Sequence, residues 1–235
     1  MFALGFGALL LLLALSRSPS SSVSGPGPDN SPTLNELRRR ALDIIAEVVP
    51  SQYGDPRFAR LGWEVKPGST ATSCGSLPGF MGVHLGDPTG ITRWGVEGAR
   101  EQGMLKGAWV VSNGKRRPSP GDIFGTARST DGILQHVGVL RRRFTDEAGR
   151  EIWETADAGQ GETDHPRAAY VLRVYDPATN TLARLDNGEP RYVHGWIDLD
   201  AWPFPHAKSF APIDLWRYQD APPIDGAERD GRLAA

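Results

Sequence analysis

Cysteine is almost absent from this sequence, and neither sign of charge is in excess. The chain of 235 residues has one cysteine, Cys74, so no internal disulfide can hold the fold together. Its 26 lysines and arginines nearly balance 28 aspartates and glutamates, and the net charge is −2. Basic residues form only short runs, at 38–40, 115–117 and 141–143, and we expect each on a solvated face or loop. This composition gives no reason to expect nucleic acid as a partner.

Long hydrophobic runs are missing except at the N-terminus. Residues 2–15 are almost wholly apolar. A membrane span needs about 20 apolar residues, whereas this run has the length of a signal-peptide core. We therefore expect residues 1–16 to be a signal peptide, and the protein to be exported to the periplasm or the extracellular space. The alternative is an uncleaved N-terminal anchor, and membrane contact is expected only through this segment.

Metal-binding motifs are missing as well. A zinc site needs three or four convergent ligands, and the sequence has no HExxH motif. The histidines other than His136 show no metal-ligand spacing, and we expect neither a metal nor a cofactor. These histidines are His84, His165, His194 and His206.

The rest of the chain divides by composition into three parts. Residues 17–32 are rich in Ser, Pro and Gly, which is typical of a flexible linker. Residues 33–204 are long enough for one globular domain with a full core. Residues 205–235 are rich in proline and show no period, so an irregular tail is expected there.

The domain is expected to begin with a helix over residues 34–49. Thr33 and Glu36 have the spacing of a capping box, in which each side chain satisfies a backbone donor of the first turn. Apolar residues follow at helical spacing until Pro50. A second helix is expected over residues 92–104.

From Pro120 onward the pattern changes to short runs of β-branched and aromatic residues separated by turns. Helices followed by a run of antiparallel strands predict an α+β fold. The expected strands cover residues 123–126, 133–143, 150–156, 168–175, 181–185 and 192–198.

Three side chains in this domain could together make and use a thiolate. Cys74 has small and polar neighbours, His136 lies in an expected strand, and Asp157 ends the next one. A thiol, an imidazole and a carboxylate are the groups needed for nucleophilic catalysis by sulfur. A helix starting near Cys74 would also favour the thiolate through its dipole. The alternative is a buried cysteine that acts as a small hydrophobic residue.

The expected hairpin brings the histidine and the carboxylate to one face. If the chain turns at residues 146–149, Gly138 lies opposite Asp157 and His136 is its diagonal neighbour, about 7–8 Å away. A slip of one residue would turn Asp157 to the other face and would favour Glu154 instead. Gln160, three residues beyond Asp157, is another alternative for the third role.

Two short segments resemble a known family. Pro120-Gly121-Asp122-Ile123, followed by His136-Val137-Gly138-Val139, is similar to the NlpC-type and CHAP-type cysteine amidases of the papain-like superfamily. The resemblance implies a papain-like α+β fold, in which N-terminal helices pack on an antiparallel sheet of about five to six strands.

The same resemblance implies a function and a role for each residue. Cys74 would be the nucleophile and His136 the base, with Asp157 orienting the imidazole and Gln160 or Glu154 as alternatives. The substrate would be an amide bond of a peptidoglycan peptide. Two other functions stay open: a non-catalytic cell-wall-binding module on the same fold, and a thiol acyltransferase or thioesterase.

Overall fold

The computed structural model describes residues 35–62, 74–87, 95–162, 165–186 and 188–204. The predicted signal peptide, linker and tail lie outside these residues, as does Thr33 of the predicted capping box. In chain order, the elements of the described part are α1 Glu36–Ala46, β1 Ser51–Gln52, α2 Pro56–Ala59, α3 Ser76–His84, α4 Gly95–Leu105, β2 Trp109–Val111, β3 Ile123–Ala127, β4 His136–Thr145, β5 Glu151–Glu162, β6 His165–Asp176, β7 Thr181–Arg184 and β8 Arg191–Ile197.

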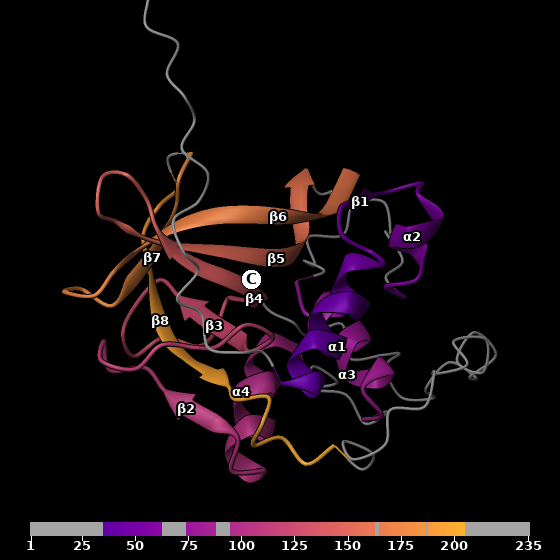
Figure 1. Cartoon of the computed structure of the whole chain (residues 1–235), viewed down its shortest axis with the longest axis horizontal. Coiled ribbons are helices and arrows are strands. Elements are labelled where there is room, and N and C mark those ends of the chain that lie inside the picture. The colour runs from indigo at the N-terminus through magenta and orange to yellow at the C-terminus, as the bar shows by residue number, and fades with distance from the viewer. Residues whose placement is uncertain (1–34, 63–73, 88–94, 163–164, 187, 205–235) are drawn as a thin grey trace, which may run out of the picture. The chain divides into compact units, whose positions relative to one another are not determined.

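Six of these strands close into an antiparallel barrel (Figure 1). Their order around the ring is β6-β5-β4-β3-β8-β7, and β7 pairs with β6 again. The short strands β1 and β2 extend the sheet at the edges of β6 and β8. The predicted papain-like α+β fold, with N-terminal helices packed on an antiparallel sheet of five to six strands, is therefore wrong, because the described chain is mostly β and its sheet is closed.

Closure of the barrel depends on pairing that no local pattern reveals. Strand β7 has four residues, and it pairs with β6 on one edge and with β8 on the other. Alternation of apolar and polar residues predicts where a strand lies. Apart from β5, the barrel strands fall within about three residues of their expected bounds, and β5 and β6 are longer than expected. This alternation does not say which strand edges meet.

Alternate residues of each barrel strand belong to two different cores. The barrel interior is filled by large side chains such as Phe124, Leu140 and Trp153. Val139 of β4 and Ala156 of β5 belong instead to a second core, together with apolar residues of α1 and α3. Helix α1 packs on α3, and α3 packs on β4 and β5, so the helices cover this outer face of the sheet (Figure 1).

Helices α1 and α4 lie where the sequence predicted helices, but their ends differ from the predicted ends. Helix α1 is shorter than the predicted 34–49, and its cap is Asn35, whose side chain accepts a hydrogen bond from the N–H of Arg38 at 2.9 Å. Helix α4 overlaps the predicted 92–104. Within the described residues, no helix has the length and apolar character needed to cross a membrane.

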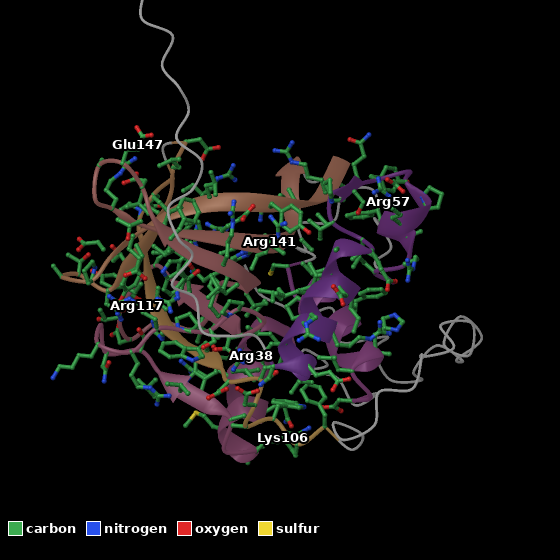
Figure 2. All side chains as sticks on the ribbon, in the orientation of Figure 1. Arg38, Arg57, Lys106, Arg117, Arg141 and Glu147 are labelled. Atoms are coloured by element: carbon green, nitrogen blue, oxygen red, sulfur yellow. The ribbon has the colours of Figure 1, made fainter. Side chains whose placement is uncertain are left out.

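A buried arginine ties α1 to the barrel. The side chain of Arg38 binds Asp122 at 2.6 Å, and it also reaches Asp198 and Asp200 at the end of β8. Arg38 is only 6 % exposed, so the expectation that residues 38–40 form a solvated face is wrong for this residue. Figure 2 labels Arg38 on α1, where the helix faces the sheet.

Candidate active site

Cys74 lies just before helix α3. The helix begins at Ser76 with Gly75 as its N-cap, and Pro78 falls in the first turn, as predicted for a helix starting after the cysteine. The positive end of the helix dipole therefore lies beside the sulfur. Small and polar neighbours do not leave Cys74 open to solvent, because the residue is 2 % exposed.

The pairing of β4 with β5 brings His136 and Asp157 to the interior face of the barrel. Val139 pairs with Ala156, which places Gly138 beside Asp157, as the sequence predicted. This register depends on a bulge that follows Leu140 and shifts the pairing by one residue. Without the shift, Asp157 would pair with Val139 and would point to the second core, between the sheet and the helices.

His136 is hydrogen-bonded on both sides of its ring. Its Nε2 bonds to Oδ1 of Asp157, and the ring also bonds to the side chain of Cys74. Because Asp157 takes Nε2, the nitrogen that remains for the sulfur is Nδ1. The structure thus joins the three side chains predicted from the sequence into one cluster, which we call the Cys-His-Asp site.

The charge state of His136 is set by these two neighbours. Burial lowers the pKa of His136, but the Asp157 carboxylate and then Cys74 outweigh burial and raise the pKa from 6.5 to about 9. The ring is therefore an imidazolium at neutral pH. A cation in contact with a thiol favours the thiolate, which is the nucleophilic form of cysteine.

Asp157 is fully buried and holds two further partners that the sequence did not suggest. Thr155 donates a hydrogen bond from its hydroxyl to Oδ2, and Arg173 donates from Nη2 to Oδ1 at 3.0 Å. Burial alone would raise the pKa of Asp157, but the charge of Arg173 and then the contact with His136 hold it well below its usual range. The aspartate is an anion at neutral pH.

A sequence signal for these two partners exists once the strand faces are known. Thr155 lies two residues before Asp157 on β5, and residues two apart on a strand share a face. Arg173 pairs with Trp153, which faces the interior core. A charged residue at an inward-facing position of a strand needs a buried partner, and Asp157 is that partner.

The two alternatives for the third role lie elsewhere. Glu154 binds Arg141 and Arg142 on the outer face of the sheet. Gln160 accepts a hydrogen bond from Arg184 at 3.1 Å, beyond a second shift in register that follows Asp157. Neither side chain is among the groups that bond to His136, and the orienting role of Asp157 stays a prediction that the geometry favours.

A pocket of about 380 Å³ is lined by residues of β6, the strand that pairs with β5 at Asp157. Ala169, which pairs with Asp157 across the β5–β6 ladder, forms part of its wall. Arg167 and Arg184 also line it, and the charge of Arg184 interacts with Asp157. The guanidinium of Arg184 is paired with Asp186, which lines the same pocket. The other lining residues are Gln160, Tyr170, Val171, Leu172, Leu185 and Asp186.

The described residues contain no group of three or more His, Cys, Asp or Glu side chains arranged to hold a metal ion. Comparison of the chain with protein-family models, with curated proteins and with solved structures gives no match.

Proposed function

We propose that this protein is a thiol-dependent hydrolase that cleaves amide bonds of peptidoglycan peptides. Cys74 is the nucleophile, His136 the general acid and base, and Asp157 the group that orients and stabilises the imidazolium. The observation that carries this proposal is that one imidazole bonds on one side to the only cysteine and on the other to a fully buried carboxylate.

The first half of the reaction acylates the cysteine. The Cys74 thiolate attacks the carbonyl carbon of the amide, and a tetrahedral intermediate forms. The proton on Nδ1 of His136 passes to the amide nitrogen, the C–N bond breaks and the amine leaves. Cys74 is then held in a thioester with the acyl group, and His136 is neutral.

The second half releases the acid. The neutral His136 takes a proton from water, whose oxygen attacks the thioester, and the C–S bond breaks to regenerate the thiolate. Cys74 contributes to the raised pKa of His136 in the resting site. Acylation removes the thiolate charge and its hydrogen bond, so the pKa of His136 falls at the step where a base is required.

Two features support a peptide of the cell wall as substrate. The Pro-Gly-Asp-Ile and His-Val-Gly-Val segments resemble amidases that act on such peptides. The pocket on β6 presents Arg167, together with Arg184, whose guanidinium is paired with Asp186, and guanidinium groups bind carboxylates well. Wall peptides carry several carboxylates. The fold itself gives no support, since the barrel is not the papain-like fold that the resemblance implied.

The direct test is digestion of purified peptidoglycan with the wild-type protein. Mass spectrometry should detect new pairs of free amino and carboxyl termini, and a thioester adduct on Cys74 should be trapped after acid quench. Cys74→Ser is the matched control, because it keeps the size and polarity of the side chain and removes the thiol. New termini produced equally by both proteins would overturn the assignment of Cys74.

The same products decide between the alternatives. Transfer of the acyl group to an added amine, with little free acid, would indicate an acyltransferase. Cleavage of thioesters but not of wall peptides would indicate a thioesterase. Binding to wall material without new termini would indicate a non-catalytic binding module.

A further inference from the structure

Arg173 is an inward-facing cation that contacts the Cys-His-Asp site. Arg173 extends from β6 and is 8 % exposed. It donates from Nη2 to Oδ1 of Asp157 at 3.0 Å, and from Nε to the hydroxyl of Thr155 at 3.1 Å. Thr155 in turn donates to the other carboxylate oxygen. Arg173 therefore donates hydrogen bonds both to the carboxylate of Asp157 and to the Thr155 hydroxyl, which itself donates to that carboxylate.

The need for this cation follows from the reaction cycle. A fully buried carboxylate is costly to ionise unless a positive charge lies next to it. In the resting site the imidazolium of His136 supplies one such charge. When His136 gives up its proton to the leaving amine, that charge disappears, and Arg173 remains as the permanent cation in contact with Asp157.

We propose that Arg173 is a positioning residue that keeps Asp157 ionised and aimed at His136 while the imidazole alternates between its charged and neutral forms. This role rests on the proposed function, because it is needed only if His136 gives and takes a proton. Without Arg173, the His136–Asp157 pair binds its proton more tightly, and His136 is a poorer acid for the leaving amine and less available as the base for water.

Other charged groups around the pair come from several elements. Cys74 faces His136 from the start of α3. Arg184 of β7 acts on Asp157 through its charge, but its guanidinium is paired with Asp186. Among the described residues, the ion pairs of Asp157 are those with His136 and Arg173. The titration of His136 should therefore respond more to Arg173 than to Arg184.

The test measures the titration of His136 directly, by NMR of protein labelled in its histidine rings, with His136→Ala used to assign the signal. Arg173→Gln keeps a hydrogen-bond donor and removes the charge, whereas Arg173→Lys keeps the charge and removes the planar fork. Arg117→Gln is the matched control, because Arg117, which Figure 2 labels, binds at 2.9 Å the carboxylate of Glu151, a residue of β5 like Asp157.

We expect Arg173→Gln to raise the midpoint of the His136 titration by about one pH unit or more. Arg173→Lys should stay within about half a unit of the wild type, and Arg117→Gln should not move it. The acidic limb of the kcat–pH profile should shift upward with the NMR midpoint in Arg173→Gln.

An unchanged midpoint in a folded Arg173→Gln would overturn the proposal and leave Arg173 a purely structural role. Should that variant not fold, Arg173→Lys decides alone, since an upward shift of a full unit there would show that charge is not what Arg173 supplies. The titration needs no substrate, so it can fail or succeed independently of whether the protein cleaves wall peptides.

Discussion

Two buried aspartates of this domain, Asp122 and Asp157, both bind an arginine, yet their acidities are moved in opposite directions. Burial raises the pKa of Asp122 to about 6, in spite of Arg38 and two backbone N–H donors that lower it. The pKa of Asp157 is instead held well below its usual range, although it is buried as deeply, because Arg173 and His136 outweigh its burial.

The difference lies in how charges are shared. At Asp122, one cation, Arg38, faces three carboxylates, since it also binds Asp198 and Asp200. At Asp157, one carboxylate faces two cations. The first arrangement ties a helix to the barrel. The second keeps an anion beside the imidazole of His136, and it is suited to stabilising an imidazolium that repeatedly loses and regains its proton.

The largest effect is expected from removing the reacting groups of the second cluster. Cys74→Ala and His136→Ala should each reduce peptide cleavage by roughly 10⁴-fold or more in protein that is still folded. The double variant should be no slower than either single one, because the two side chains act as a unit. Additive losses in steady-state assays would mean that they act separately.

Asp157 comes next. Asp157→Ala should lower kcat by roughly 10²–10⁴-fold, because the imidazolium loses the carboxylate that orients and stabilises it. Glu154→Ala serves as a control on the same strand and should remain within about twofold of the wild type, since Glu154 lies on the outer face of the sheet and does not bond to His136. A crippled Gln160→Ala with a silent Asp157→Ala would assign the orienting role to the amide.

Asp157 also shows which parts of the site could be predicted from the sequence. The residue types and their order indicate Cys74, His136 and Asp157, because thiol catalysis needs those three groups. Their shared face follows from a hairpin whose register the structure reaches only through the bulge after Leu140. Arg173 could not be found in this way, because β6 is paired to β5 by the fold, and its contact with Asp157 spans 16 residues of sequence.

Substitution of Arg38 tests the cluster that Arg38 forms with Asp122, Asp198 and Asp200. Arg38→Met should destabilise the fold by about 3–5 kcal/mol, because Asp122 is left as an unpaired buried charge. The effect should appear as a lower midpoint in urea denaturation. Cys74 in the folded fraction should still react with iodoacetamide at the wild-type rate, since the network around Arg38 does not include the site. A slower reaction would show that the two clusters are coupled.

Gly138 tests how tightly the Cys-His-Asp site is packed. A Cβ at this position would lie 2.6 Å from Oδ1 of Asp157 and 2.8 Å from the ring of Phe124. Gly138→Ala should therefore displace the carboxylate, lower kcat by about 10²-fold and cost about 1–3 kcal/mol of stability. Wild-type activity in this variant, measured with the same peptide assay, would mean that Asp157 can move without loss.

The smallest effect is a dependence of stability on pH. The pKa of His136 in the fold, about 9, exceeds its ordinary value of 6.5, so its stabilising contribution is complete below pH 6.5 and is lost as pH rises through about 9. The pKa of Asp157 lies below its ordinary 3.8, so its contribution is present above that pH and is lost as pH falls.

The measurement is the urea midpoint as a function of pH in wild type and in His136→Ala. The difference between the two proteins should be largest between about pH 4 and pH 6.5 and should shrink toward pH 9. A difference that grows as pH rises would show that His136 is neutral in the folded protein.

The sequence predicted two of the helices, the six strands that form the barrel and three candidate site residues. Those strand and helix positions follow from local periodicity, and the candidate nucleophile, base and orienting group follow from residue type and order. Tertiary structure alone decided that the strands close into a barrel, that Arg38 is buried, that Cys74 is covered, and that Arg173 supports Asp157. Each of these depends on which distant surfaces meet, and the free energy of such contacts is set by burial and charge in three dimensions rather than by any neighbouring residue in the chain.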